Sequence, residues 1–435
     1  MKAVKFALFW CLCFFALAAG VHAQAGPWRL GREPQRFVLE NGLTVILQDD
    51  DAAVNSVVQL FVRGGSRDDP PAGSGLAYMT MRLALEIPDQ TKLRQLMEFG
   101  SSFALHVGED YSLITIRALS RYLQPTLEIL TAIFTEPLFS GMRIDGIKEQ
   151  MRHLQKRATD EPNELMRSLT ARNFFGVSGY GASLFGDEAS LAAIAKKDIQ
   201  AFFDVHFSAA NMVAVIISDL DDTALKPLLS RLLGRLPAGR LASPAPMPAV
   251  QAEKTELSVT RQSAQTHIAC AVLLPALSVE NYVMASLLQT WLGKGIGCKL
   301  WSLRDQSDLT YGVNADVLPL QEGMLLNVYL KTGYPRAAEA QKQLRGILMA
   351  VHENGIGDAE LSTAKAYALA DFWRENETRE RRAATLAFME GMGLSYRLAG
   401  DFPARLGAVT TADMNRFIRE WLAPERWFLL RIGPQ

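Results

Sequence analysis

One helix-and-strand pattern occurs twice along the chain, and this repeat constrains the fold more than any other feature of the sequence. Residues 191–219 hold a helical pattern followed by a continuous apolar run, and residues 406–434 hold the same pattern at a constant offset of 215 positions. Asp198 in the first copy and Asp413 in the second are expected to cap the helix. Recurrence at this interval predicts two homologous domains.

Strand and helix patterns alternate in both halves. Residues 36–47 contain two apolar runs around an Asn-Gly turn, which is a hairpin signal. We predict an α+β fold in which each domain has a mixed or antiparallel sheet with helices mainly on one face. The domains are expected at residues 33–235 and 257–435, joined by a linker at 236–256 that contains four prolines and no apolar period.

The N-terminal residues are typical of a secretory signal peptide. Lys2 and Lys5 precede an apolar run at 6–21, and small residues then lead to a cleavage site after Ala23. We expect residues 1–23 to be removed and the protein to be secreted, in a bacterium to the periplasm. An uncleaved membrane anchor is the alternative, because the run is nearly long enough to span a bilayer.

Net charge and cysteine content give weaker indications than the signal peptide does. A formal net charge of −1 gives no reason to expect nucleic acid or an acidic membrane surface as a partner. Cys270 and Cys298 remain once the signal peptide is removed. Export permits a disulfide between them, and two buried free thiols are the alternative.

Several short segments together carry a family resemblance. They are Glu-Asn-Gly-Leu-Thr-Val at 40–45, Gly-Gly-Ser-Arg at 64–67, Gly-Leu-Ala at 75–77, Glu-Pro-Leu-Phe at 136–139 and Asp-Glu-Pro at 160–162. In order and spacing the chain resembles the pitrilysin/insulinase family of zinc peptidases from about residue 36 to its C-terminus. The resemblance implies that the two domains face each other like a clam shell.

The zinc-binding motif of that family is missing. In family members the same Gly-x-Ala is followed by His-x-x-Glu-His, whereas this chain has Tyr78, Met81 and Arg82 at the three chemical positions. The third ligand position, about eight residues before the Asp-x-Pro turn, corresponds to Leu154. A guanidinium cannot lose its proton to bind a cation, and adjacent His153 is more simply a solvated helix residue. We therefore expect no metal and no cofactor in this chain.

The second half retains a different family feature. Gly293, Gly295 and Gly297 form a glycine-rich turn, and Arg304 and Tyr311 follow with the seven-residue spacing seen in family second domains. The resemblance implies that this Arg and Tyr hold the substrate backbone and stabilise an oxyanion at a zinc site. The alternatives are a solvated arginine and a tyrosine that begins a strand. A phosphate cradle is disfavoured because no Walker lysine-hydroxyl pair follows.

A third feature concerns the strand pattern at 100–106. In active relatives the equivalent strand lies at the sheet edge and pairs with the substrate as an added strand. Here Ser101 and Phe103 replace the usual Gly and Asn. An edge that accepts peptide and an edge buried by neighbouring chain are both open at this point.

These features lead to one functional prediction. We expect a non-catalytic subunit of an exported zinc metallopeptidase complex, whose Arg304 and Tyr311 reach a homologous partner that carries the zinc motif and the zinc. Peptide is the expected substrate, with no nucleic acid and no stable membrane insertion after signal cleavage. The alternative is a peptide-binding or scaffolding homodimer with no peptidase partner.

Overall fold

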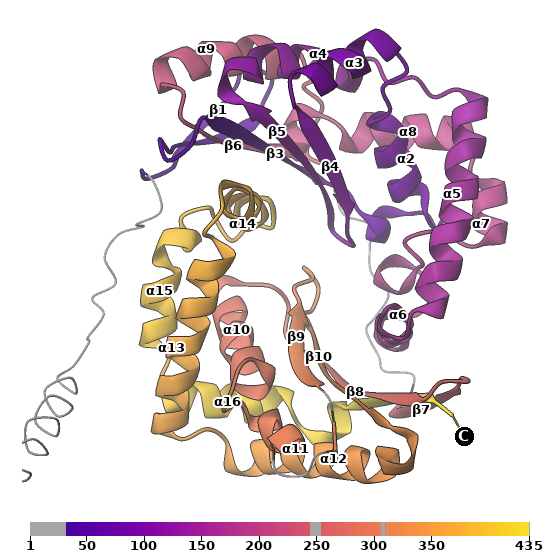
Figure 1. The fold of residues 1–435 in the computed structure, drawn as a ribbon, viewed down its shortest axis with the longest axis vertical. Coiled ribbons are helices and arrows are strands. Elements are labelled where there is room, and N and C mark those ends of the chain that lie inside the picture. The colour runs from indigo at the N-terminus through magenta and orange to yellow at the C-terminus, as the bar shows by residue number, and fades with distance from the viewer. Residues whose placement is uncertain (1–31, 244–253, 306–308, 311, 435) are drawn as a thin grey trace, which may run out of the picture.

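The computed structural model describes residues 32–243, 254–305, 309–310 and 312–434. Two β-sheets, one from each half of the chain, lie one above the other in Figure 1, and most helices lie on their outer sides. Residues 1–23 lie outside the described part of the chain, as do residues 244–253 of the expected linker. The signal peptide and the domain boundaries therefore stay predictions.

The first sheet is mixed and has the strand order β1-β2-β6-β3-β5-β4. Its strands are β1 (Gln35–Val38), β2 (Thr44–Asp49), β3 (Asn55–Arg63), β4 (Ser102–Val107), β5 (Tyr111–Leu119) and β6 (Met212–Ser218). β6 runs parallel to β2 and antiparallel to β3. All of β6 is buried, as its continuous apolar sequence requires for a strand covered on both faces. Gly42 adopts a φ of 90° in the Asn-Gly turn between β1 and β2.

Helices surround this sheet. They are α2 (Leu76–Ala84), α3 (Gln90–Glu98), α4 (Leu123–Thr135), α5 (Gly141–Asp160), α6 (Pro162–Phe175), α7 (Glu188–Ala193), α8 (Lys196–His206) and α9 (Asp222–Leu233). Short 3-10 helices connect several elements of the whole chain, at Ser66–Asp68, Ser120–Tyr122, Gly179–Gly181, Ala209–Asn211, Lys299–Trp301, Tyr334–Arg336 and Pro424–Arg426.

The second sheet repeats the plan with the strand order β7-β11-β8-β10-β9. Its strands are β7 (Glu256–Thr260), β8 (Gln265–Leu273), β9 (Gly312–Leu318), β10 (Leu325–Gly333) and β11 (Phe428–Gly433). β11 runs parallel to β7 and antiparallel to β8, as β6 does with β2 and β3. The helices of this half are α10 (Val279–Gly293), α11 (Ser302–Asp305), α12 (Ala337–Asn354), α13 (Asp358–Glu375), α14 (Arg379–Gly391), α15 (Leu398–Ala408) and α16 (Thr411–Trp421).

The sequence repeat corresponds to equivalent elements. Both ends of α8 and α16 differ by 215 positions, and each helix leads into a central strand. The expected caps need a correction, because Ala195 and Thr410 are the N-cap residues. Asp198 and Asp413 are the third helical residues, and their carboxylates accept hydrogen bonds from the N-cap N–H groups at 2.9 and 3.2 Å.

The two domains exchange one helix each. Helix α14 of the second domain packs against β3 and β6 on the inner face of the first sheet, and α6 of the first domain packs against β8 and β11 (Figure 1). Phe61 of β3 consequently shares a buried cluster with Leu386 of α14, and Phe174 of α6 shares one with Phe428 of β11. Each domain therefore completes the core of the other.

Ion pairs reinforce the contact of α14 with the first sheet. Arg379 and Arg382 both donate to Asp50, and Arg382 Nε also donates to Gln48 Oε1 at 2.9 Å. Burial acts to raise the pKa of Asp50, but donation from Ala52 N–H and from the two arginines holds it below its usual value. The carboxylate is therefore charged where it meets α14.

The predicted α+β fold, with two homologous domains facing each other, is confirmed. Cys270 and Cys298 are both buried free thiols, so the disulfide alternative is not realised. Across the described residues, no helix combines the length and the apolar character needed to cross a membrane.

Candidate functional site

Helix α2 carries the positions at which the peptidase family binds zinc. Its N-cap, Gly75, has a φ of 93°, and a Cβ there would lie 2.9 Å from Gly186 N and from Met151 Cε. The carboxylate of Asp69 accepts hydrogen bonds from Gly75 N and Ala77 N, both at 2.7 Å. Burial raises the pKa of Asp69 to about 8, although these N–H donors oppose the rise. The start of α2 is therefore fixed by close packing and by a buried cap.

The three motif positions are filled by packing side chains. The half-buried Tyr78 ring meets Phe185 edge-on, with 5.0 Å between ring centroids, and burial raises the pKa of its hydroxyl. Met81 has no exposed surface and belongs to the core of the first domain. Arg82 is partly exposed one helical turn after Tyr78. A buried thioether and a guanidinium do not fit the zinc ligands and general base of a peptidase.

The third ligand position is equally unsuited to zinc. Leu154 is half-buried on α5, the helix that packs against α2. Neighbouring His153 is exposed and lies 3.5 Å from Glu149 on the same helix. Within the described ranges, no group of three or more His, Cys, Asp or Glu side chains is placed to hold a metal ion. The residues at the ligand positions therefore do not fit a zinc ion.

Close packing requires glycine at two positions of the glycine-rich turn. A Cβ at Gly293 would lie 2.2 Å from the backbone nitrogen of Ala315 on β9, and one at Gly295 would lie 2.3 Å from the Tyr367 ring. Gly297 has a φ of 93° but faces open space. The turn therefore passes unusually close to β9 and to α13 before it opens toward solvent.

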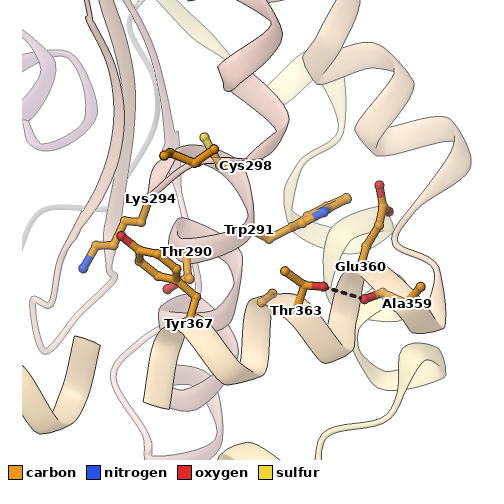
Figure 2. Close-up of a pocket in the computed structure, with 11 residues that line it drawn as sticks. Thr290, Trp291, Lys294, Cys298, Ala359, Glu360, Thr363 and Tyr367 are labelled. Carbon is orange, nitrogen blue, oxygen red and sulfur yellow. Dashed lines mark hydrogen bonds between the residues drawn. The ribbon is translucent and has the colours of Figure 1, made fainter. Parts of the chain in front are cut away.

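A pocket of about 220 Å³ lies between this turn, α10 and α13. In Figure 2, Lys294 and Tyr367 lie at one end of it, and Trp291 and Glu360 lie at the other. Lys294 pairs with Asp371 of α13 at 2.7 Å, and Lys299, just beyond the turn, pairs with Glu360. These contacts fasten the turn to α13 and leave Ile296 as its exposed tip.

Arg304 is the described member of the predicted Arg/Tyr pair. It is exposed on α11, and its guanidinium stacks over the ring of Trp301 at 4.9 Å. It forms no ion pair with a described residue. Tyr311 lies outside the described residues, immediately before β9. In Figure 1, α11 lies beside α12 on the side of the second domain that is far from α2, so one chain does not bring Arg304 to the Tyr78 helix.

Two family models match consecutive parts of the chain. Residues 44–188 match the model described as insulinase (peptidase family M16), and residues 193–367 match the model described as peptidase M16 inactive domain. Together they cover most of the first domain and the second domain as far as α13. This chain belongs to the M16 peptidase family.

Individual relatives are similar over three quarters of the chain or more. An uncharacterized zinc protease of Bacillus subtilis is 18% identical over 92% of this chain and 98% of its own length. One of Mycobacterium leprae is 24% identical over 76% of each chain. Among solved structures, an M16 inactive domain from Pseudomonas fluorescens superposes with a TM-score of 0.85 at 21% identity, covering 93% of this chain and 98% of that one. The structure of a Helicobacter pylori protease superposes with a TM-score of 0.82 at 18% identity, covering 92% of this chain and 99% of that one.

The sheet edges of this M16 chain differ in accessibility. β4 pairs only with β5 among the described strands, so its outer edge is open. At the edge of the second sheet, Gln289 of α10 accepts a hydrogen bond from Val317 N of β9 at 3.0 Å. Gly293 also presses its main chain against Ala315 there. Helix α10 thus covers the β9 edge, and of these two edges only β4 is left available for strand addition.

Sequence reasoning missed two residues that build this site. Asp69 caps α2 from a turn six residues upstream, and Gln289 covers the β9 edge from 28 residues upstream. Asp69 could have been found as an Asp shortly before a helix that begins at glycine. Gln289 carries no local signal, because only the packing of α10 on β9 brings it there.

Proposed function

We propose that this chain is the non-catalytic subunit of an exported zinc metallopeptidase complex. The observation that carries the proposal is the interior of α2. The M16 fold is complete, yet the position of the general base is Met81, a core residue without exposed surface. Such a helix contributes to stability rather than to hydrolysis. Residues 193–367, in the other part of the chain, match an M16 model described as inactive, which is consistent with a non-catalytic role.

The chemistry of Arg304 supports the proposal that this chain contributes a side chain to the active site of a partner. A guanidinium offers several N–H donors in a fixed planar geometry. Its stacking on Trp301 limits the rotamers of the exposed side chain and so prepares it to meet a carbonyl or a developing oxyanion. With Tyr311 as a second, directional O–H donor, this half of the chamber would hold the substrate while a homologous partner supplies the zinc motif.

The open β4 edge supports contact with a peptide substrate. Gly108 N donates to Tyr111 O at 2.8 Å, which makes this a hydrogen-bonded pair at the β4–β5 turn. Because pair types alternate along an antiparallel ladder, the main-chain groups of Phe103 and Leu105 point to the open edge. An extended peptide can satisfy them as an added strand.

Purified protein tests the proposal most directly. We expect less than stoichiometric zinc by metal analysis and no cleavage of a quenched fluorescent peptide by the chain alone. We also expect the chain to co-purify from its native host with an M16 homologue that carries His-x-x-Glu-His. Zinc-dependent cleavage by the isolated chain would contradict the proposal. Co-purification of this chain only with itself would instead support the homodimeric peptide-binding alternative.

A further inference from the structure

A second open edge lies at the opposite side of the first sheet, where β1 runs beside α9. β1 pairs only with β2 among the described strands, so it ends the sheet. A groove of about 730 Å³ separates this strand from α9 and is lined by residues 35–41 and by the helix. Figure 1 shows α9 lying over this end of the sheet, away from β4.

The groove is held open by contacts at both ends. Near the start of β1, Lys226 Nζ of α9 donates to Gln35 Oε1 at 2.8 Å. At the other end, Asn41 Nδ2 of the hairpin turn donates to Leu233 O at 2.9 Å and to Leu236 O at 3.1 Å, which satisfies the last carbonyl of α9 and one just beyond the helix. Strand and helix therefore run side by side in the same direction, at a fixed spacing.

The strand presents unpaired main-chain groups to the groove. Leu39 N donates to Leu43 O at 2.9 Å, so these residues form a hydrogen-bonded pair of the β1–β2 ladder. Pair types alternate along an antiparallel ladder. Arg36 and Val38 are consequently in non-hydrogen-bonded pairs with β2, and their N–H and C=O groups point outward. An edge of this kind is a template for another strand.

The charged side chains that line the groove are three basic residues and one acidic residue. Lys226 and Arg231 come from α9 and Arg36 comes from β1, whereas Glu40 is the one acidic residue among those that line it. Arg36 Nε pairs with Glu390 Oε1 of the second domain at 2.7 Å. On α9, Lys226 and Arg231 form longer, partly exposed ion pairs, at 3.4 Å with Asp222 and at 3.6 Å with Glu128. Such pairs are weak and leave both cations able to meet another carboxylate.

We propose that this β1–α9 groove binds an extended, acidic polypeptide segment that adds to the first sheet as a seventh strand. Its main chain pairs with the outward groups of Arg36 and Val38. Alternate side chains face α9, where an Asp or Glu meets Arg231 and Lys226. Peptide addition between an edge strand and a helix is an established recognition mode. The groove is separate from the β4 edge, so a partner held here leaves that edge free.

Fluorescence anisotropy with a labelled acetyl-Val-Glu-Val-Glu-Val-amide peptide tests the proposal, with the Val-Lys-Val-Lys-Val peptide as the charge control. We expect saturable binding of the acidic peptide and at least about tenfold weaker binding of the basic one, since two charges are reversed. Hydrogen exchange measured by mass spectrometry should show slower exchange in residues 33–40 on binding. Equal binding of both peptides, or protection at residues 102–107 instead, would overturn the proposal.

Matched variants separate strand addition from a general charge effect. Val38→Pro removes an outward N–H without touching the β1–β2 ladder, and Arg231→Glu reverses a charge inside the groove. Each is expected to weaken binding about tenfold. Val38→Thr keeps the N–H, and Arg235→Glu makes the same charge change on an exposed residue outside the groove, so both should bind as wild type does.

Two outcomes would replace the peptide by another occupant. Dimerisation that Val38→Pro abolishes, without peptide binding, would assign the edge to a second copy of this chain. Peptide binding that appears only after deletion of the residues before Arg32 would assign the groove to the chain itself. Either result overturns the proposal, and neither bears on the subunit role inferred from α2.

Discussion

The guanidinium of Arg67 lies 2.9 Å from the carboxylate of Asp110, and both side chains are buried at the boundary between the two domains, with 2% and 3% of their surface exposed. Arg67 also donates to Tyr180 Oη at 2.8 Å and pairs with Glu322 of the second domain at 3.0 Å. Gln321 N donates to Asp110 at 3.0 Å. The pair therefore ties the first domain to the connection between β9 and β10.

Removing Asp110 should destabilise the whole protein. Asp110→Ala removes the buried carboxylate that lies 2.9 Å from the buried Arg67 guanidinium, which should cost about 3–5 kcal/mol of the free energy of unfolding. Urea denaturation followed by circular dichroism measures this loss. Arg152→Ala removes exposed ion pairs on α5 and should leave the transition nearly unchanged. Similar effects of both variants would mean that Arg67 reaches water.

The interior of α2 gives a second prediction. Met81→Glu restores the carboxylate of the family motif but places a charge at a site without exposed surface, so we expect a loss of several kcal/mol or failure to fold. Met81→Leu conserves volume and should cost less than about 1.5 kcal/mol. Thermal unfolding compares the two. A Met81→Glu protein as stable as Met81→Leu would show that this position opens to solvent.

The glycine turn gives a third prediction. Gly293→Ala would drive a Cβ to 2.2 Å from Ala315 N, and the overpacking should cost about 1–3 kcal/mol as α10 moves from β9. Gly346→Ala is the matched control, because Gly346 lies on the exposed side of α12 with nothing within 4 Å. That change should stabilise the protein by about 0.5–1 kcal/mol. Thermal unfolding should therefore show a lower melting temperature for Gly293→Ala and a higher one for Gly346→Ala than for wild type.

The sequence predicted the repeat, the α+β class and the helix at the degenerate motif, because each depends on local periodicity and spacing. It could not predict that α6 and α14 exchange domains. An apolar helix face indicates that a helix packs but not against which sheet. The Arg67 network was equally hidden, since Gln321 stands 211 positions from Asp110. At the candidate site, the resemblance and the spacing singled out Arg304, whose role stays a prediction, and its stacking on Trp301 depends on the short helical turn that contains it.

The buried cap of α2 makes stability depend on pH. Because the pKa of Asp69 is raised to about 8 in the folded protein, the folded state binds a proton that the unfolded state releases near pH 4. The stability that the protonated Asp69 carboxyl contributes is therefore fully present below about pH 4, and it is lost as the pH rises through 8. Asp69→Asn should be less stable at low pH, because it loses one acceptor. The gap in melting temperature between wild type and variant should narrow from about pH 5 to about pH 9. A constant gap would show that Asp69 is already charged at low pH.

Arg304 and Tyr311 supply the last prediction, which concerns the complex. If both donate to an oxyanion at the partner's zinc site, Arg304→Ala and Tyr311→Phe should each lower kcat of the reconstituted pair by about 10²–10³, equivalent to roughly 3–4 kcal/mol. Zinc content and subunit association should stay unchanged, because Arg304 makes no ion pair with a described residue and its exposed side chain can be truncated without disturbing the core. Arg419→Ala, at an exposed position of α16 in the same domain, serves as the charge-matched control. Turnover within twofold of wild type for both variants would remove the pair from the mechanism. A loss of association instead would place Arg304 at the subunit interface rather than at the substrate.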